Sequence, residues 1–449
     1  MTRPAPRDPY AVLAAALLVT AAVLVGHRIQ HAHHTLRVNW PPLLATWHPH
    51  AGPGTPAALL VAAAVAIHGP ALAARLPWRA LLAAVWGTST AWVLSLALVD
   101  GWQRGVAGRL TTPHEYLRAV DRFPDVPAAL HDFAHHILIG SPDNWPAHVA
   151  GHPPAATLTF VLLDRLGLRG GGWAGTWCVV VGATAGVAVL VALRALAGER
   201  LARRAAPFLV LAPAAVWMGT SADAYFAAVA AWAVALLALA VTGRPAAWAA
   251  GSGLLFGLAC YLSYGLTLLA FLGAAVLLLR RRRVRERPAP LVWLLAGLAV
   301  VPTAFTLAGF DWWEAYRLLV TRYHQGAGGV RPYGYWVWAN LACTVLITGF
   351  ATAAGLRRTG AVLLLRPDAG GRRHRPAGEA ATAVLVTAAL LALLVADLSG
   401  MSKAETERIW LPFALWLLPA CAFLTRPRAW LAAQAALALL LNHLLLTGW

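Results

Sequence analysis

The sequence predicts an all-α fold: a polytopic transmembrane helical bundle of about thirteen helices, with juxtamembrane helices in a large extracytoplasmic loop. Of the 449 residues, 59% are hydrophobic and only 12% are charged. The apolar residues occur in blocks of roughly 17–22, which is the length that a bilayer core requires. Blocks such as 226–241 and 380–396 are apolar on every side, whereas the helices of a large soluble protein carry an amphipathic stripe.

The thirteen helices are expected wherever an apolar block is long enough to cross a membrane. The block 11–25 is read as the first membrane helix rather than as a cleavable signal peptide. The pair 246–261 and 264–279 is short and can also form one long kinked helix, since its glycines permit bending or close packing. The expected ranges are 10–27, 56–74, 79–99, 174–195, 205–219, 224–242, 246–261, 264–279, 290–309, 334–356, 379–397, 409–425 and 428–446.

The net charge of +18 would indicate nucleic-acid binding in a soluble protein. Here the basic residues lie in the turns between apolar blocks, as the positive-inside rule describes. The four cysteines are far apart, without metal-binding spacing, and are interpreted as small apolar fillers. Abundant Ala, Arg, Gly and Trp beside the single lysine, Lys403, indicate a GC-rich and therefore bacterial genome.

Placing the N-terminus in the cytoplasm puts most basic turns on the inner side. The inner segments then hold 23 of the 36 basic residues but only 5 of the 18 acidic ones. These inner turns contain Arg75/Arg79, Arg194–Arg204, Arg244, Arg280–Arg287, Arg357–Arg375 and Arg426/Arg428. The outer segments are 28–55, 100–173, 220–223, 262–263, 310–333 and 398–408. Since the inner turns offer few catalytic side chains, we expect function at the outer boundary of the cell membrane.

The outer segment 100–173 carries the most distinctive pattern. It contains His114-Glu115-Tyr116, several acids and the run from Asp143 to His152-Pro153-Pro154. The two prolines predict the start of a helix over 155–166. At about 12 residues, this helix is too short to span a bilayer and is expected to lie in the interface.

This order of features resembles the glycosyltransferase C superfamily, in particular its bacterial branch related to protein O-mannosyltransferases and aminoarabinose transferases. The resemblance covers residues 92–270, with a weaker likeness near the C-terminus. His114-Glu115-Tyr116 occupies the place of the family's acidic motif, and His152-Pro153-Pro154 matches a second motif. Further matching segments are the helix 173–195, the basic turn Arg200–Arg204, the helix 205–218, the outer turn Ser221-Ala222-Asp223 and the turn Tyr261–Gly265.

The chain departs from the family pattern in three respects. His114 replaces the usual first aspartate of the acidic pair, which leaves Glu115, Asp121 and, third, Asp100 as alternatives for the reactive carboxylate. Two helices precede the family's first, and the large soluble C-terminal domain of some relatives is absent. The resemblance divides the chain into 1–78, with extra helices and a histidine-rich outer loop, and 79–449, the glycosyltransferase-C-like domain.

The resemblance implies transfer of a sugar from a polyprenyl-phosphate donor to an extracytoplasmic acceptor, which can be a glycan, a lipid or a protein. Such a reaction needs a carboxylate that deprotonates the acceptor hydroxyl. It also needs basic side chains, or a divalent cation such as Mg²⁺ or Mn²⁺, beside the phosphate leaving group. The candidate catalytic residues are Glu115, Asp121 and Asp223.

The candidate substrate-binding residues lie in the same outer segments. Arg408 can bind a phosphate bidentately at the membrane surface, although an interfacial anchor is the alternative interpretation. The histidines can contact phosphate, sugar or a metal, or make only structural hydrogen bonds. The full set is His148, His152, Tyr264, Lys403, Glu405 and Arg408.

Other interpretations remain open at this point. The histidine-rich segment 27–50 can bind a transition metal, but its spacing fixes no ligand geometry, and no metal ligand is assigned. A multi-pass transporter or flippase of lipid-linked sugars would carry charges and broken helices at the membrane midplane. A scaffold protein of the cell envelope would use the outer loops as interaction surfaces.

Overall fold

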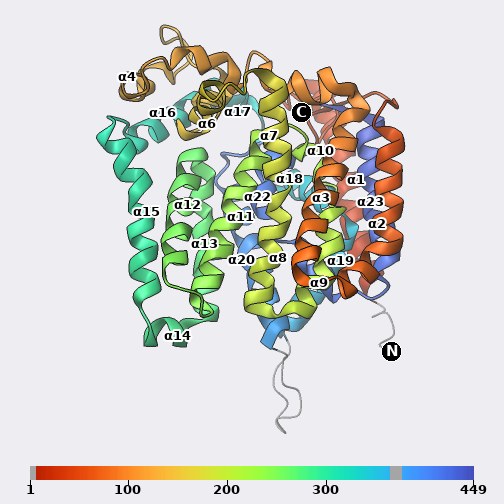
Figure 1. Ribbon diagram of the computed structural model, residues 1–449. Coiled ribbons are helices and arrows are strands. Elements are labelled where there is room, and N and C mark those ends of the chain that lie inside the picture. The colour runs from red at the N-terminus through yellow and green to blue at the C-terminus, as the bar shows by residue number, and fades with distance from the viewer. Residues whose placement is uncertain (1–6, 365–376, 449) are drawn as a thin grey trace.

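The computed structural model describes residues 7–364 and 377–448, which form helices packed side by side (Figure 1). Seven helices are long and apolar enough to cross a membrane, or eight if α18 and α19 form one span bent by 107°. The chain is therefore a multi-pass membrane protein, but the predicted count of about thirteen spans is not confirmed. These spans are α1 (Asp8–His33), α2 (Thr55–Arg75), α3 (Trp78–Ala97), the consecutive pair α7 (Gly170–Gly182) and α8 (Thr184–Ala197), α11 (Ala222–Val241), α15 (Ala289–Leu307) and α20 (Ala377–Leu398), with α18 (Tyr333–Thr348) and α19 (Phe350–Leu364) as the bent pair.

The other expected spans are short or broken helices, except that 428–446 forms the continuous 18-residue α23, which is not among the helices that are long and apolar enough to cross a membrane. Proline lacks the amide hydrogen that a helix interior needs, and Pro213 and Pro419 lie within two of the expected ranges, 205–219 and 409–425. Gly349, with φ 84°, ends α18 in the left-handed region that favours glycine. The resulting elements are α9 (Glu199–Val210), α10 (Ala215–Met218), α12 (Ala247–Leu262), η6 (Tyr264–Leu269), α13 (Ala270–Leu279), α14 (Arg281–Glu286), α21 (Thr406–Ile409), α22 (Leu411–Ala414), η7 (Leu418–Phe423) and α23 (Pro427–Leu444).

The centre of the bundle is α11, which is buried along nearly its whole length and packs against α7, α8, α12 and α13. At one edge, α15 buries only Gly297. A β-carbon at Gly253 of α12 would lie 2.0 Å from the Leu294 carbonyl oxygen, and one at Gly297 would lie 2.1 Å from that of Ala250. These glycines therefore let α12 and α15 approach closely, as expected for small residues between membrane helices.

One end of the bundle, here called the loop end, holds residues 100–173 together with the other segments expected outside (Figure 1). The amide of His148 donates to the carbonyl of His114, and the amide of His48 donates to that of Leu444. The expected interfacial helix is α6 (Ala155–Arg165). The remaining elements here are η1 (Leu98–Asp100), η2 (Gln103–Ala107), η3 (Arg109–Thr111), η4 (Tyr116–Arg122), α4 (Val126–His131), η5 (Phe133–His136), α5 (Ala147–Gly151), α16 (Trp312–Gln325), α17 (Ala327–Val330) and the two-stranded antiparallel sheet of β1 (Ala45–Trp47) and β2 (Leu445–Thr447).

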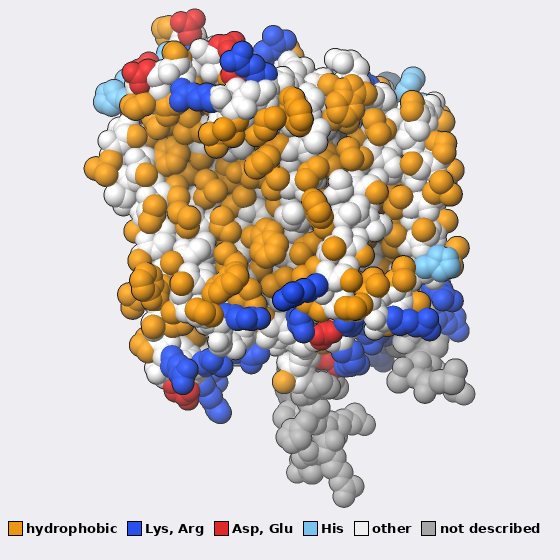
Figure 2. Space-filling view, viewed as in Figure 1, with side chains coloured by type: hydrophobic (Ala, Val, Ile, Leu, Met, Phe, Trp, Pro, Cys, Tyr) orange, Lys and Arg blue, Asp and Glu red, His pale blue; other side chains and the backbone are white. Residues whose placement is uncertain are grey.

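The opposite end, here called the arginine end, carries a band of basic side chains along the lower edge of Figure 2. Arg280 donates to the carbonyls of Ala195 and Leu196, and Arg204 donates to that of Leu424. The basic turns predicted to share one side thus meet at one end of the bundle. Arg3 and the arginines within 366–375 lie outside the described residues.

Candidate functional site

A buried ion pair joins two outer segments that are far apart in the sequence, 220–223 and 398–408. Nη1 of Arg408 lies 2.5 Å from Oδ2 of Asp223, and both side chains are almost fully buried. Asp223 sits in the first turn of α11, where the Ser221 side chain caps the helix by accepting from the Asp223 amide. Arg408 comes from the one-turn helix α21, which packs against α11.

His148 connects this pair to the acidic motif of the long loop. Its Nδ1 lies 2.9 Å from Oε1 of Glu115, and its Nε2 lies 3.3 Å from Nη2 of Arg408. An arginine only donates hydrogen bonds, so Nε2 of His148 accepts from Arg408 while Nδ1 faces Glu115. A continuous chain of polar contacts thus runs from Glu115 through His148 and Arg408 to Asp223.

Glu405 and Arg331 extend this chain of polar contacts. Glu405 lies 3.5 Å from Arg408 and 3.1 Å from Arg331, which also donates to the carbonyls of Leu36 and Lys403. Burial raises the pKa of Glu405, but Arg331 and then Arg408 outweigh burial and hold that pKa below its usual value. Sequence analysis did not select Arg331. The available signal was its position immediately before an apolar helix, which Arg408 shares.

Aromatic side chains pack along one side of this chain of polar contacts. Tyr116 stacks on Phe160 with ring centroids 5.3 Å apart and lies 5.7 Å from the ring of His152. His152 contacts the carbonyl oxygen of His148 at 2.8 Å through Nδ1, and burial lowers the pKa of His152 to about 4. His152 is therefore neutral at ordinary pH. The buried Tyr116 hydroxyl has no hydrogen-bond partner among the described residues, and burial, followed by the charges of Asp223 and Glu115, raises its pKa.

The formal charges of the cluster nearly cancel. Glu115, Asp223 and Glu405 supply three negative charges, while Arg331 and Arg408 supply two positive ones. Lys403 adds a third positive charge nearby, with Nζ 2.9 Å from the Gly328 carbonyl oxygen. An anion would therefore be stabilised here by individual N–H groups in a low-dielectric setting rather than by net charge.

The structure does not bring all the predicted residues together. Asp121 is exposed and lines a separate cavity of about 310 Å³ with Arg118 and Asp164. Within residues 7–364 and 377–448, no hydrogen bond or ion pair joins Asp121 to Glu115 or Asp223. Asp100 is also apart from the cluster and pairs with His50 and Arg109 at 2.9 Å.

Tyr264 packs against aromatic side chains of α16 rather than against the charged cluster. It is buried, and its ring lies 5.0 Å from that of Trp312 and 5.5 Å from that of Tyr316. A small cavity of about 40 Å³ runs between Asp223 and the neighbouring turn at Ser263 and Gly265. The turn that contains Tyr264 therefore borders the site on the face of Asp223 that is turned toward α22 and η6.

Glu407 is a buried carboxyl to which sequence analysis assigned no role. Its Oε1 accepts from the amide of Leu44 at 3.0 Å, and its Oε2 has no hydrogen-bond partner in the described part of the chain. Burial raises the pKa of Glu407 to about 7. This carboxyl links the histidine-rich outer segment to α21, directly beside Arg408.

The donor set does not fit a divalent cation. Across the described ranges, no group of three or more His, Cys, Asp or Glu side chains could hold a metal ion. In the cluster, Arg408 and Arg331 already occupy the carboxylates of Asp223 and Glu405. In the histidine-rich segment, His50 pairs with Asp100, and His27 packs edge-on against Trp40.

Comparisons with known proteins gave matches only among solved structures. No protein-family model matches the sequence, and no curated protein matches it significantly. The chain is similar to three structures of the Archaeoglobus fulgidus oligosaccharyltransferase: with a tethered acceptor peptide containing the NVT sequon, in the apo form, and with zinc and sulfate. The TM-scores are 0.42, 0.43 and 0.39, at 15%, 14% and 16% identity, over 77%, 78% and 80% of this chain. The chain spans about half of their length, at 49%, 50% and 53%.

Proposed function

We propose that this protein is a membrane glycosyltransferase that transfers a sugar from a polyprenyl-phosphate donor to an extracytoplasmic acceptor. One observation carries the proposal: the buried polar chain Glu115–His148–Arg408–Asp223 at the loop end of a membrane-spanning bundle. Buried charged groups are costly in a membrane protein and commonly mark a functional site. The motif resemblance described above supplies the reaction class.

The proposed reaction is a displacement at the anomeric carbon of the donor sugar. The acceptor hydroxyl loses its proton to a carboxylate, and the acceptor oxygen forms a bond to the anomeric carbon of the sugar. The bond from that carbon to the phosphate oxygen breaks, and the polyprenyl phosphate leaves with the electron pair. The proton ends on the carboxylate, from which it returns to solvent.

We assign the role of base to Glu115. Its carboxylate lies against His148, whereas the carboxylate of Asp223 already accepts a hydrogen bond from Arg408. Arg408 and Lys403 are assigned to the leaving phosphate, since guanidinium and ammonium groups bind phosphate strongly. Asp223 and Glu405 orient Arg408 through their ion pairs with it.

Tyr264, His148 and His152 complete the proposed binding surface. His148 positions Glu115, while His152 and the aromatic side chains beside it present polar edges and ring faces that suit a sugar. Asp121 remains a second candidate base that acts from the neighbouring cavity. On this proposal, residues 79–449 form the catalytic domain, residues 1–78 form the extra N-terminal part, and the loop end faces away from the cytoplasm.

The test is a transfer assay with membranes that contain the protein and polyprenyl-phosphate mannose or aminoarabinose carrying a radiolabelled sugar. Transfer is measured as label that leaves the polyprenyl phosphate and appears on another lipid, a glycan or a protein. Glu115→Gln, Asp121→Asn and Asp223→Asn are compared with Glu314→Gln, an exposed acid at the same end. We expect loss of at least about 100-fold for Glu115→Gln, in the range of general-base catalysis, and no loss for Glu314→Gln.

Two outcomes would contradict the proposal. Full transfer by all three acidic variants would remove the catalytic assignment. Loss of transfer in Asp121→Asn alone would move the base to the neighbouring cavity and overturn the role of Glu115. A transporter would instead move the intact labelled donor across the membrane without releasing its sugar.

A further inference from the structure

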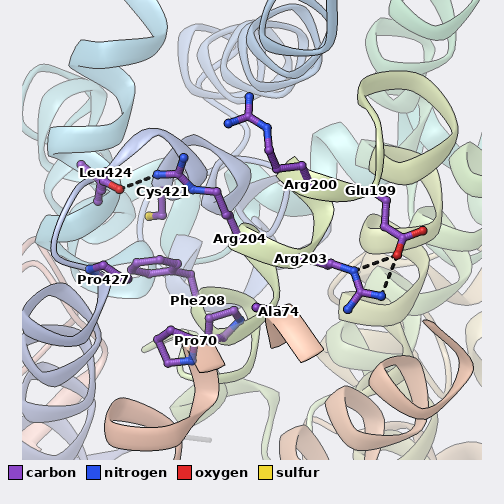
Figure 3. A pocket seen from close by; sticks show the side chains of 11 residues that line it. Pro70, Ala74, Glu199, Arg200, Arg203, Arg204, Phe208, Cys421, Leu424 and Pro427 are labelled. Carbon is purple, nitrogen blue, oxygen red and sulfur yellow. Dashed lines mark hydrogen bonds and ion pairs between the residues drawn. The ribbon is translucent and has the colours of Figure 1, made fainter. Parts of the chain in front are cut away.

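A second cavity lies at the arginine end of the bundle, far from the proposed catalytic site. It has a volume of about 510 Å³ and lies between α2, α9, the turn after η7 and the start of α23. Figure 3 shows Arg200 and Arg204 projecting from α9 above the side chains of Phe208, Pro70 and Pro427. The cavity therefore has a basic rim and an apolar floor.

The basic rim is only partly neutralised. Glu199 pairs with Arg203 at 2.6 Å and with Arg194 at 2.8 Å. Glu379 lies 3.4 Å from Arg200, while Arg204 donates to the neutral carbonyl of Leu424. Four arginines against two glutamates leave two positive charges at this rim. Burial lowers the pKa of Arg204, and the like charge of Arg200 lowers it further.

The floor of the cavity adjoins a surface that faces lipid. Pro70 and Ala74 come from α2, on which Ile67 and Leu72 are 52% and 51% exposed. A ligand with its anionic group among the arginines can therefore extend an apolar part along α2 without leaving a nonpolar environment. Basic pockets between membrane helices have this combination of a charged rim and an apolar wall when they bind anionic lipid headgroups.

We propose that this cavity binds the phosphodiester headgroup of an anionic membrane phospholipid, with Arg200 and Arg204 as its ligands and its acyl chains beside α2 and Phe208. The two excess positive charges attract a monoanionic phosphodiester, which neutralises one of them. Guanidinium groups donate two parallel hydrogen bonds to phosphate oxygens. Partial exposure of Arg200, at 66% of its side chain, leaves it accessible to such a ligand.

The experiment measures retained lipid by native mass spectrometry on the purified full chain, released from vesicles that contain equal phosphatidylglycerol and phosphatidylcholine. The wild type is compared with Arg200→Gln, with the double variant Arg200→Gln/Arg204→Gln, and with the control Arg285→Gln/Arg287→Gln. The control removes two exposed arginines from the same end but outside this cavity. Excess glycerol phosphate or inorganic phosphate is added in separate arms.

We expect the wild type and the control to retain phosphatidylglycerol over phosphatidylcholine. Each cavity arginine that is removed should weaken retention about fivefold, the order of one basic side chain near a membrane surface. Neither soluble phosphate should displace the lipid. Equal retention by all proteins, equal retention of both lipids, or displacement by inorganic phosphate would overturn the proposal. Arg200→Gln is the variant to use if the double variant does not fold, because within residues 7–364 and 377–448 the Arg200 side chain makes one long contact, with Glu379 at 3.4 Å.

Discussion

Arg408 and Asp223 are 185 residues apart in the chain, yet their side chains form a buried ion pair at 2.5 Å. The pair fixes the one-turn helix α21 against the first turn of α11, which is the central helix of the bundle. Through His148, the same arginine is tied to Glu115 in the long loop. This contact therefore organises the loop end.

Replacing one residue of the Arg408–Asp223 pair should destabilise the protein more than replacing both. Arg408→Gln leaves the buried Asp223 carboxylate without its main partner, which typically costs about 3–5 kcal/mol. The double variant Arg408→Gln/Asp223→Asn removes that charge and should recover part of the loss. The measurement is the midpoint of thermal unfolding in detergent. A double variant that is less stable than Arg408→Gln would show that the two side chains do not interact as described.

Glu407 should make stability fall as pH rises. Burial raises its pKa in the folded protein to about 7, against an ordinary value of 4.5. Between these values the unfolded state loses its proton while the folded state keeps it, so the folded state loses up to about 3 kcal/mol of stability by pH 7. Glu407→Gln removes this dependence and can still accept from Leu44. Unfolding midpoints measured from pH 4 to pH 8 should decline more steeply for the wild type than for the variant, and parallel curves would refute the assignment.

Arg331 should be required for the shape of the loop end. Arg331→Gln removes the partner of Glu405 and the donor to two carbonyl groups, which costs about 1–3 kcal/mol for each buried group left unpaired. We expect faster proteolytic cleavage within residues 398–408 and weaker donor binding. Arg317→Gln, an exposed residue of α16 at the same end, is the matched control. Identical cleavage patterns for both variants would show that Arg331 does not maintain the structure of the loop end.

The two ends should face opposite sides of the membrane, with the loop end outside. Single cysteines are placed at Ala128 in α4 and at Arg285 in α14, both of which are exposed. A membrane-impermeant maleimide should label Ala128→Cys in intact cells and Arg285→Cys only after lysis. The native Cys178, Cys343 and Cys421 are buried and Cys260 is half-buried, so labelling of the unsubstituted protein sets the background. The opposite labelling pattern would show that the loop end faces the cytoplasm.

The sequence predicted the long spans because hydropathy depends only on local composition. It placed α2, α3, α11, α15 and α20 within a few residues. It could not show that the block 409–425 contains short turns, since tertiary packing decides whether prolines such as Pro412 and Pro419 kink a helix or end it.

The same limit applies to the site. The motifs identified Glu115, Asp223, His148 and Arg408, which meet in the structure. They could not reveal Arg331 or the burial of Glu407, since only the folded arrangement shows whether a charge before an apolar helix faces solvent or the protein interior. Asp121 carries the same local signals as Glu115 but faces a different cavity.

The most direct test of the central claim is the position of the donor phosphate in a cryo-electron microscopy structure of the protein with bound polyprenyl-phosphate sugar. The account predicts phosphate density within hydrogen-bonding distance of Arg408, with the sugar directed toward Glu115 and His148. Phosphate density at any other place, such as the arginine end, with the Arg408–Asp223 pair unliganded, would contradict it.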